Sequence, residues 1–227
     1  MTAIHNAVPS LCPQPIAHGK LADSAGYFLL TEFINMEATD GDHTSDLLLA
    51  QKLAQLHSSP PPVLKGFNKS VFGFHLMTCV GRTRQNNSWN HSWPKFFAEN
   101  RLKAVWKTVE KVHSTDCELQ NLLDRVLEEV VPSLLGYGHL GEREGVQPAL
   151  VHGDLWYGNK ARGSIGGKGV QDMIFDPSCC YAHSEYELGI MKMFGGFSEG
   201  FFEEYHRLIP KTYPEAEYDD RLSLYEL

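Results

Sequence analysis

Two long stripes of apolar residues dominate the pattern of hydrophobic and polar positions. Between Asp116 and Leu135, apolar residues recur with helical spacing, at positions 119, 122, 123, 126, 127, 130, 131, 134 and 135. This period predicts an amphipathic helix, and a similar pattern predicts another from Trp93 to His113. We expect both helices to face the core. A leucine-rich pattern predicts a further helix that ends at His57, before a run of prolines.

Apolar runs without this spacing predict strands. Pro13–Leu21 and Tyr27–Ile34 predict two strands joined by a turn. Because nearly every residue of the second is apolar or favours strands, we expect other elements to cover both of its faces. Leu150-Val151 and Met173-Ile174-Phe175 predict two short buried strands. The glycine-rich segment 162–169 lies between them without a G-x-x-x-x-G-K-[ST] motif, so we expect a hairpin tip there.

Three further helices are predicted near the C-terminus. Ser184 begins the first as its N-cap, with Glu187 at the capping-box position, and Gly195-Gly196 ends it. The other two span about 198–209 and 214–227.

The segment from Phe67 to Trp93 shows no period and is rich in glycine, asparagine and aromatic residues. A long ordered loop of this kind is often functional. The alternative is a surface excursion held by Trp89 and Trp93, and the sequence leaves both interpretations open.

Composition narrows the class of protein without identifying it. The 227 residues are 42% hydrophobic and 21% charged, as in ordinary globular proteins. A formal charge of −8 argues against broad nucleic-acid or anionic-membrane binding, so any nucleotide phosphate must be handled by Mg²⁺ and local cations. Five scattered cysteines without a C-x-x-C motif predict reduced thiols in a cytoplasmic protein.

Polar residues follow the two buried strands at the point where each strand ends. Asp154 and Asn159 follow the first, and Asp176 follows the second. The spacing resembles the kinase pattern H-x-D-x-x-x-x-N followed by a metal-binding Asp. A carboxylate such as Asp154 can accept the proton of an attacking hydroxyl. An amide oxygen and a second carboxylate can hold Mg²⁺ against nucleotide phosphates.

Either loop alone is also compatible with an ordinary turn, because His-Gly-Asp and Asp-Pro are common turn sequences. The two loops together, in this order and about twenty residues apart, favour the kinase interpretation.

Several further motifs extend the likeness over nearly the whole chain. They are Gln85-Asn86-x-x-Trp89, His152-Gly153-Asp154-Leu155-Trp156-x-Gly158-Asn159, Phe175-Asp176-Pro177, the segment 183–188 and the segment 193–197. In these motifs the chain resembles the fructosamine 3-kinase family, also called ketosamine or protein-ribulosamine 3-kinases. The resemblance implies an α+β, protein-kinase-like fold of the aminoglycoside-phosphotransferase type. Residues 1–36 would be a remnant of the N-lobe sheet with the hinge, and residues 37–227 the helical C-lobe.

The resemblance implies ATP-dependent phosphorylation of the sugar 3-hydroxyl of ketosamine adducts on protein lysines, a deglycation step. Asp154 would be the base, Asn159 and Asp176 the Mg²⁺ ligands, and His152 a brace for its loop. The hinge residues Glu32-Phe33-Ile34 would meet the adenine of ATP.

Four more residues are candidates for the acceptor side of the site. Trp156 and Tyr157 would either stack on the sugar or simply pack. His183 and Glu185 would either line the acceptor pocket or cap a helix. Because Gly153 stands where protein kinases have Arg, control by activation-loop phosphorylation is not expected.

Three classes of function stay open. The first is a ketosamine kinase acting on glycated proteins or small ketosamines. The second is a related kinase with an aminoglycoside-like or choline-like acceptor, and the third is an inactive kinase lobe that serves as a binding module. Too few residues precede Pro13 to supply a glycine-rich loop, strand lysine and helix glutamate, so we expect the chain alone to be nearly inactive. An exposed hairpin edge favours self-association, and no nucleic-acid or membrane partner is expected.

Overall fold

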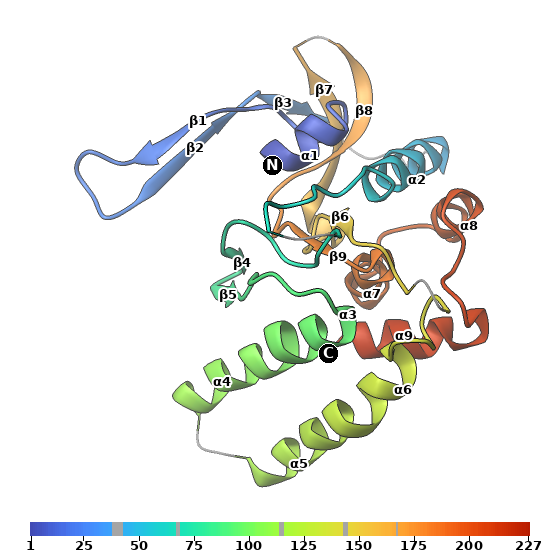
Figure 1. Ribbon diagram of the computed structural model, residues 1–227. Helices are drawn as coiled ribbons and strands as arrows, with labels where there is room; N and C mark the ends of the chain where they lie inside the picture. The colour runs from blue at the N-terminus through green and yellow to red at the C-terminus, as the bar shows by residue number, and fades with distance from the viewer. Residues whose placement is uncertain (38–42, 67–68, 114–115, 143–144, 167) are drawn as a thin grey trace.

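The computed structural model describes residues 1–37, 43–66, 69–113, 116–142, 145–166 and 168–227. Short sheets lie over a larger set of helices (Figure 1). The strands are β1 (Pro15–Lys20), β2 (Tyr27–Thr31), β3 (Ile34–Met36), β4 (Thr78–Val80), β5 (Thr83–Gln85), β6 (Ala149–Val151), β7 (Lys160–Ile165), β8 (Lys168–Ile174) and β9 (Cys180–Ala182). The α-helices are α1 (Thr2–Ala7), α2 (His43–His57), α3 (Trp93–Phe96), α4 (Lys103–Val112), α5 (Cys117–Arg125), α6 (Val131–Leu135), α7 (Ser184–Phe194), α8 (Glu199–Leu208) and α9 (Tyr218–Tyr225).

Antiparallel pairing joins the described strands into small sheets. β1 pairs with β2, β4 with β5, and β6 with β9, while β3, β7 and β8 form a three-stranded sheet in that order. Within this sheet Ile34 pairs with Ile165, and Lys160 pairs with Ile174. The glycine-rich segment 162–169 includes the end of β7 and the start of β8, which pair antiparallel as the predicted hairpin, and Gly167 lies outside the described residues.

The core is built around Trp93, which is 2% exposed. Its ring lies 5.7 Å from that of Tyr186 and 5.9 Å from that of Tyr225, so α3, α7 and α9 meet there. The helix α1 was not predicted, because one turn of chain shows no period. It buries Ile4, and beyond it the carbonyl of Leu11 accepts the backbone N–H of Ile174 at 2.8 Å.

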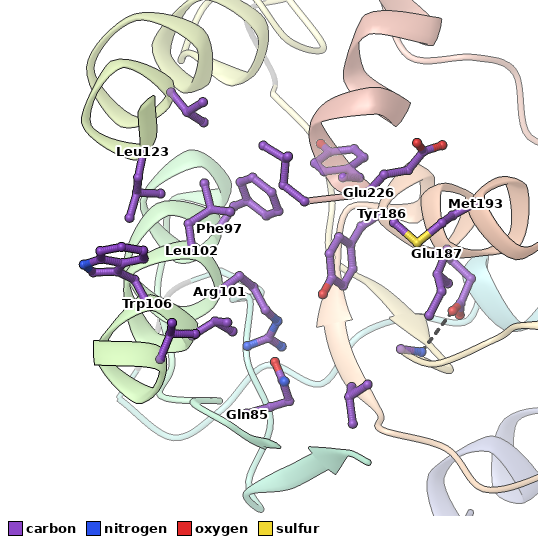
Figure 2. A pocket seen from close by; sticks show the side chains of 18 of the residues that line it. Gln85, Phe97, Arg101, Leu102, Trp106, Leu123, Tyr186, Glu187, Met193 and Glu226 are labelled. Carbon is purple, nitrogen blue, oxygen red and sulfur yellow. Dashed lines mark hydrogen bonds between the residues drawn. The ribbon is translucent and has the colours of Figure 1, made fainter. Parts of the chain in front are cut away.

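The two long helical stripes form helices, each interrupted by a π-helical turn, at 97–102 and 126–130. The parts of these helices labelled α4 and α5 bury no residue fully, although Leu123 of α5 packs against the core as a partly buried residue. Their apolar sides instead line a cavity of about 560 Å³ between them and α7 (Figure 2). The cavity reaches Gly153 and Glu187. None of the helices in the described part of the chain is long and apolar enough to cross a membrane.

The β1–β2 hairpin projects from the body of the molecule (Figure 1). The side chains of Tyr27, Leu29 and Leu30 are 72%, 57% and 51% exposed. The expectation that this strand is covered on both faces is therefore wrong. Its one paired neighbour among the described residues is β1, which meets it along an edge and covers neither face.

Candidate active site

The first loop, residues 152–159, leaves the buried strand β6 through a turn that requires glycine. Gly153 has φ of +80°, and a Cβ atom there would lie 2.3 Å from the carbonyl oxygen of Ser178. The missing side chain lets the first loop lie against the second loop, residues 175–178. Two segments about twenty residues apart in the sequence are thereby brought together.

His152 joins the two loops. Its buried Nε2 lies 2.9 Å from the carbonyl oxygen of Phe175, and the backbone N–H of Asp154 lies 3.3 Å from its Nδ1. Because Nδ1 faces a donor, the ring proton belongs on Nε2, which donates to Phe175. Burial lowers the pKa of His152, so the ring is neutral near pH 7. His152 thus serves as a brace between the loops.

Asn159 is directed toward Asp154. Its amide nitrogen donates to the carbonyl oxygen of Asp154 at 2.8 Å and to the carboxylate Oδ2 of Asp154 at 3.3 Å. The backbone carbonyl oxygen of Asn159 accepts the backbone N–H of Phe175 at 3.0 Å. Asn159 is buried, and both of these side-chain hydrogen bonds use its amide nitrogen and not its side-chain oxygen.

Asp154 and Asp176 are close enough to repel each other. Burial raises the pKa of Asp154 and the negative charge of Asp176 raises it further, whereas the hydrogen bond from Asn159 lowers it. The resulting pKa is about 6. A carboxyl group with this pKa is deprotonated near pH 7 and can take up a proton readily, which is the property of a general base.

Asp176 is exposed and adopts a φ of +56°, the left-handed region that residues with a Cβ seldom occupy. Its carboxylate and the amide oxygen of Asn159 are hard oxygen donors of the kind that Mg²⁺ prefers. Among the described residues no group of three or more His, Cys, Asp or Glu gathers as a metal cluster. An ion held here would depend on these two side chains and on oxygens from water or a ligand.

Trp156 and Tyr157 lie beside the first loop. Their rings are 4.9 Å apart, and the ring of Trp156 is 5.8 Å from that of Phe194. These contacts favour the packing interpretation for Trp156, which is partly buried. Tyr157 is 54% exposed, so its ring keeps surface on which a sugar could stack.

His183 and Glu185 do not line an open site. They are 2% and 1% exposed. The Nη2 and Nε of Arg221 donate to the Glu185 carboxylate, and His183 Nδ1 lies 2.9 Å from the hydroxyl of Tyr225. The acceptor-pocket interpretation is therefore wrong for both residues, because a buried and hydrogen-bonded side chain cannot reach a substrate. They connect α7 to the C-terminal helix α9.

The predicted helix cap at Ser184 is also wrong. His183 is the N-cap and Ser184 is the first helical residue. Glu187 does not complete a capping box, because its carboxylate accepts the backbone N–H groups of His152 and Gly153. Sequence reasoning missed this contact with the first loop. A glutamate on the apolar side of a helix was the one available signal.

The hinge residues form an ordered connection from β2 to β3. The side chain of Glu32 accepts the backbone N–H of Gln14 at 2.9 Å, and its own N–H donates to the carbonyl of Gln14 at 3.0 Å. Ile34 pairs with Ile165 on β7, the strand that leaves the first loop. Phe33 is 82% exposed. The hinge and the first loop are therefore linked through one sheet.

The long segment before α3, which is the predicted loop from Phe67 to Trp93, is hydrogen-bonded to the residues that follow Asp176. Asn87 donates to the hydroxyl of Thr78 at 2.9 Å, and Ser178 donates to the same hydroxyl at 3.0 Å. Arg101 donates to Asn87 at 2.9 Å and lies 3.2 Å from the sulfur of Cys180. The segment thus supports the second loop, which is a more specific role than a surface excursion.

A family model described as fructosamine kinase matches residues 1–227. The chain belongs to the fructosamine kinase family. Two curated relatives agree with this assignment. Ketosamine-3-kinase of Mus musculus is 35% identical over 246 aligned positions, which cover 100% of the chain and 72% of the mouse protein. The chloroplastic protein-ribulosamine 3-kinase of Arabidopsis thaliana is 31% identical, with 95% of the chain and 58% of the plant protein covered.

Solved structures of similar proteins establish the fold. A candidate fructosamine-3-kinase from Haemophilus somnus superposes with a TM-score of 0.72 at 23% identity, and one from Thermobifida fusca with 0.75 at 19%. Each comparison covers 99% of the chain and 67% of the other protein. The chain therefore has the protein-kinase-like fold that the sequence predicts. It spans about three fifths to seven tenths of the length of these relatives. A kinase family implies ATP as the phosphoryl donor.

Proposed function

We propose that this fructosamine kinase family chain transfers the γ-phosphoryl group of ATP to the 3-hydroxyl of ketosamines on protein lysines. Membership of the family over residues 1–227 is the observation that carries the proposal. The meeting of Asp154, Asn159 and Asp176 supports it, because phosphoryl transfer needs a base and oxygen ligands for a cation in one place.

In the proposed reaction Asp154 accepts the proton of the attacking sugar hydroxyl. Its carboxylate is oriented by the amide of Asn159 at 3.3 Å. Asp176 and the amide oxygen of Asn159 would hold Mg²⁺, which when bound offsets the negative charge of the phosphates. Tyr157, with Trp156 behind it, would support the sugar ring.

The nucleotide side of the proposed site is the hinge. The adenine would lie against Glu32-Phe33-Ile34, where β2 passes into β3. A boundary at residue 36 would then place the hinge before the lobe that carries the base, to which β3 is joined by pairing with β7. We further propose a cytoplasmic protein, consistent with five unpaired cysteines, which acts on glycated proteins or small ketosamines. Self-association through the projecting hairpin is part of the same proposal.

Comparison of acceptors tests the reaction. With the chain in excess over acceptor, single-turnover assays with Mg²⁺ and ATP would compare fructosyl-lysine and ribulosyl-lysine with an aminoglycoside and choline. Because the chain alone is expected to be nearly inactive, we expect a slowly formed phosphate ester, detected by mass spectrometry, on the ketosamines alone. Phosphorylation of the aminoglycoside or choline alone would favour the related-kinase alternative. Failure to bind Mg²⁺·ATP in calorimetry would favour a binding module.

Acidification is expected to slow the reaction. Burial and Asp176 raise the pKa of Asp154 to about 6, so proton uptake below that pH removes the base. The rate should fall about tenfold per pH unit on the acid side. Because a cation at Asp176 offsets part of the repulsion, the inflection with Mg²⁺·ATP bound should lie at or below this pKa. Single-turnover rates measured across the range test this, and a rate that stays constant through strongly acidic pH would contradict it.

A further inference from the structure

One stretch of the chain, from within α2 to the start of η1, carries charge of a single sign. Residues 47–98 contain no Asp or Glu, although the whole chain has a formal charge of −8. The same stretch contains six Lys or Arg residues, which are Lys52, Lys65, Lys69, Arg82, Arg84 and Lys95. A basic region in an acidic protein attracts anionic groups to one part of its surface.

Two of these residues lie on the hairpin of β4 and β5. Gln85 on β5 is buried and lines the cavity (Figure 2), whereas Arg84 and its cross-strand partner Cys79 are exposed. Because successive side chains of a strand point to opposite faces, Arg84 points away from the cavity. Arg82 is exposed in the turn between the two strands. Within the described part of the chain, neither guanidinium forms an ion pair.

The hairpin is fixed beside the second loop. The hydroxyl of Ser178, two residues after Asp176, donates to the hydroxyl of Thr78 on β4 at 3.0 Å. Shortly before β4, Gly73 and Tyr181 exchange backbone hydrogen bonds of 3.0 Å and 2.8 Å. The arginines therefore occupy a defined position next to the candidate active site.

Two apolar side chains are exposed next to the arginines in the sequence. Leu76 and Met77 directly precede β4, and both are exposed. We call Leu76, Met77, Arg82 and Arg84 the hairpin surface. Arginine and methionine are enriched in protein interfaces, so the hairpin surface has the composition of one that binds protein.

We propose that the hairpin surface binds acidic side chains of the protein substrate, on the segment that carries the glycated lysine. The proposal rests on the proposed function, because it assigns a substrate class to the same site. An extended chain advances about 3.4 Å per residue, so residues a few positions from the modified lysine would extend past the second loop to the hairpin. Asp154 and Asp176 repel an acidic segment, and the two arginines offset this repulsion.

The test compares two double variants of the whole chain. Arg82→Gln/Arg84→Gln removes the positive charge of the hairpin surface. Lys111→Gln/Arg125→Gln removes the same charge from exposed positions at the ends of α4 and α5. None of the four side chains is buried, so all variants are expected to fold.

Peptide binding is the main measurement. Two peptides share a central fructosyl-lysine and differ in their flanks, which are glutamate in one and glutamine in the other. Fluorescence anisotropy should show that the wild-type chain prefers the glutamate peptide and that added salt removes the preference. The hairpin variant should bind the glutamate peptide about 3- to 10-fold more weakly, as expected for two exposed ion pairs, and the glutamine peptide equally well. The control variant should keep the wild-type preference.

Three results would overturn the proposal. The first is a wild-type chain without a preference for the glutamate peptide, and the second is an equal loss in the hairpin and control variants. The third is a hairpin variant with unchanged peptide binding but weaker binding of Mg²⁺·ATP in calorimetry, which would assign the arginines to the nucleotide phosphates. If the wild-type chain phosphorylates neither peptide, the proposed function fails, but the binding comparison still decides whether the hairpin surface recognises acidic segments.

Discussion

Replacement of Asp154 by alanine is expected to reduce phosphoryl transfer by about 10²- to 10⁴-fold, the usual contribution of a general base. The expected loss follows from geometry: this carboxylate is held by Asn159 at 3.3 Å beside Asp176 and has a pKa of about 6. Single-turnover assays with fructosyl-lysine measure the effect. Because Asp154 is not proposed as a metal ligand, Asp154→Ala should still bind Mg²⁺·ATP in calorimetry.

The nucleotide measurement separates loss of the base from loss of the fold. A variant that binds nucleotide normally and keeps a rate within tenfold of wild type would show that Asp154 is not the base. A variant that loses both properties would show instead that Asp154 has a structural role in the loop.

Arg221→Ala is expected to have the largest effect on stability. The guanidinium is 0% exposed and donates to Glu185 at 2.7 Å and 3.1 Å and to the carbonyl oxygens of Thr212 and Pro214. Its removal leaves the Glu185 carboxylate buried without its cation. Loss of one partner from a buried pair typically costs about 3–5 kcal/mol of unfolding free energy. Urea denaturation monitored by circular dichroism would measure it.

Arg207 is the control for this prediction. It forms a similar pair with Glu204, with Arg207 Nε 2.7 Å from the carboxylate, but the Arg207 side chain is 64% exposed. Exposed pairs are screened by water and contribute little. The urea midpoint of Arg207→Ala should therefore stay close to wild type. Equal midpoints for Arg207→Ala and Arg221→Ala would mean that the buried network does not stabilise the fold.

The two loops could be predicted from the sequence because their chemistry is local. The spacing from Asp154 to Asn159 fits one turn after a strand, and Asp176 follows the next hairpin strand, so a linear pattern contains most of the geometry. The prediction needed no information on which helix lies below the loops.

The misses at Glu185, Glu187 and β2 depend on distant contacts. Whether Glu185 and Glu187 face solvent or the interior is decided by α9, by the first loop and by α2, which are far away in the sequence. The apolar stripe of β2 predicted burial that the strand does not have, because nothing in the stripe specifies a covering partner. α4 and α5 bury no residue fully for a similar reason, since their apolar sides line a cavity.

The left-handed backbone at Asp176 narrows the amino acids that natural variation can place there. A longer acidic residue such as glutamate would preserve the charge, yet it lacks the local side-chain hydrogen bonding that lets aspartate and asparagine tolerate this conformation. Aspartate at this position therefore suits the backbone as well as supplying a carboxylate. Charge alone is an incomplete criterion when equivalent residues are sought in distant homologues.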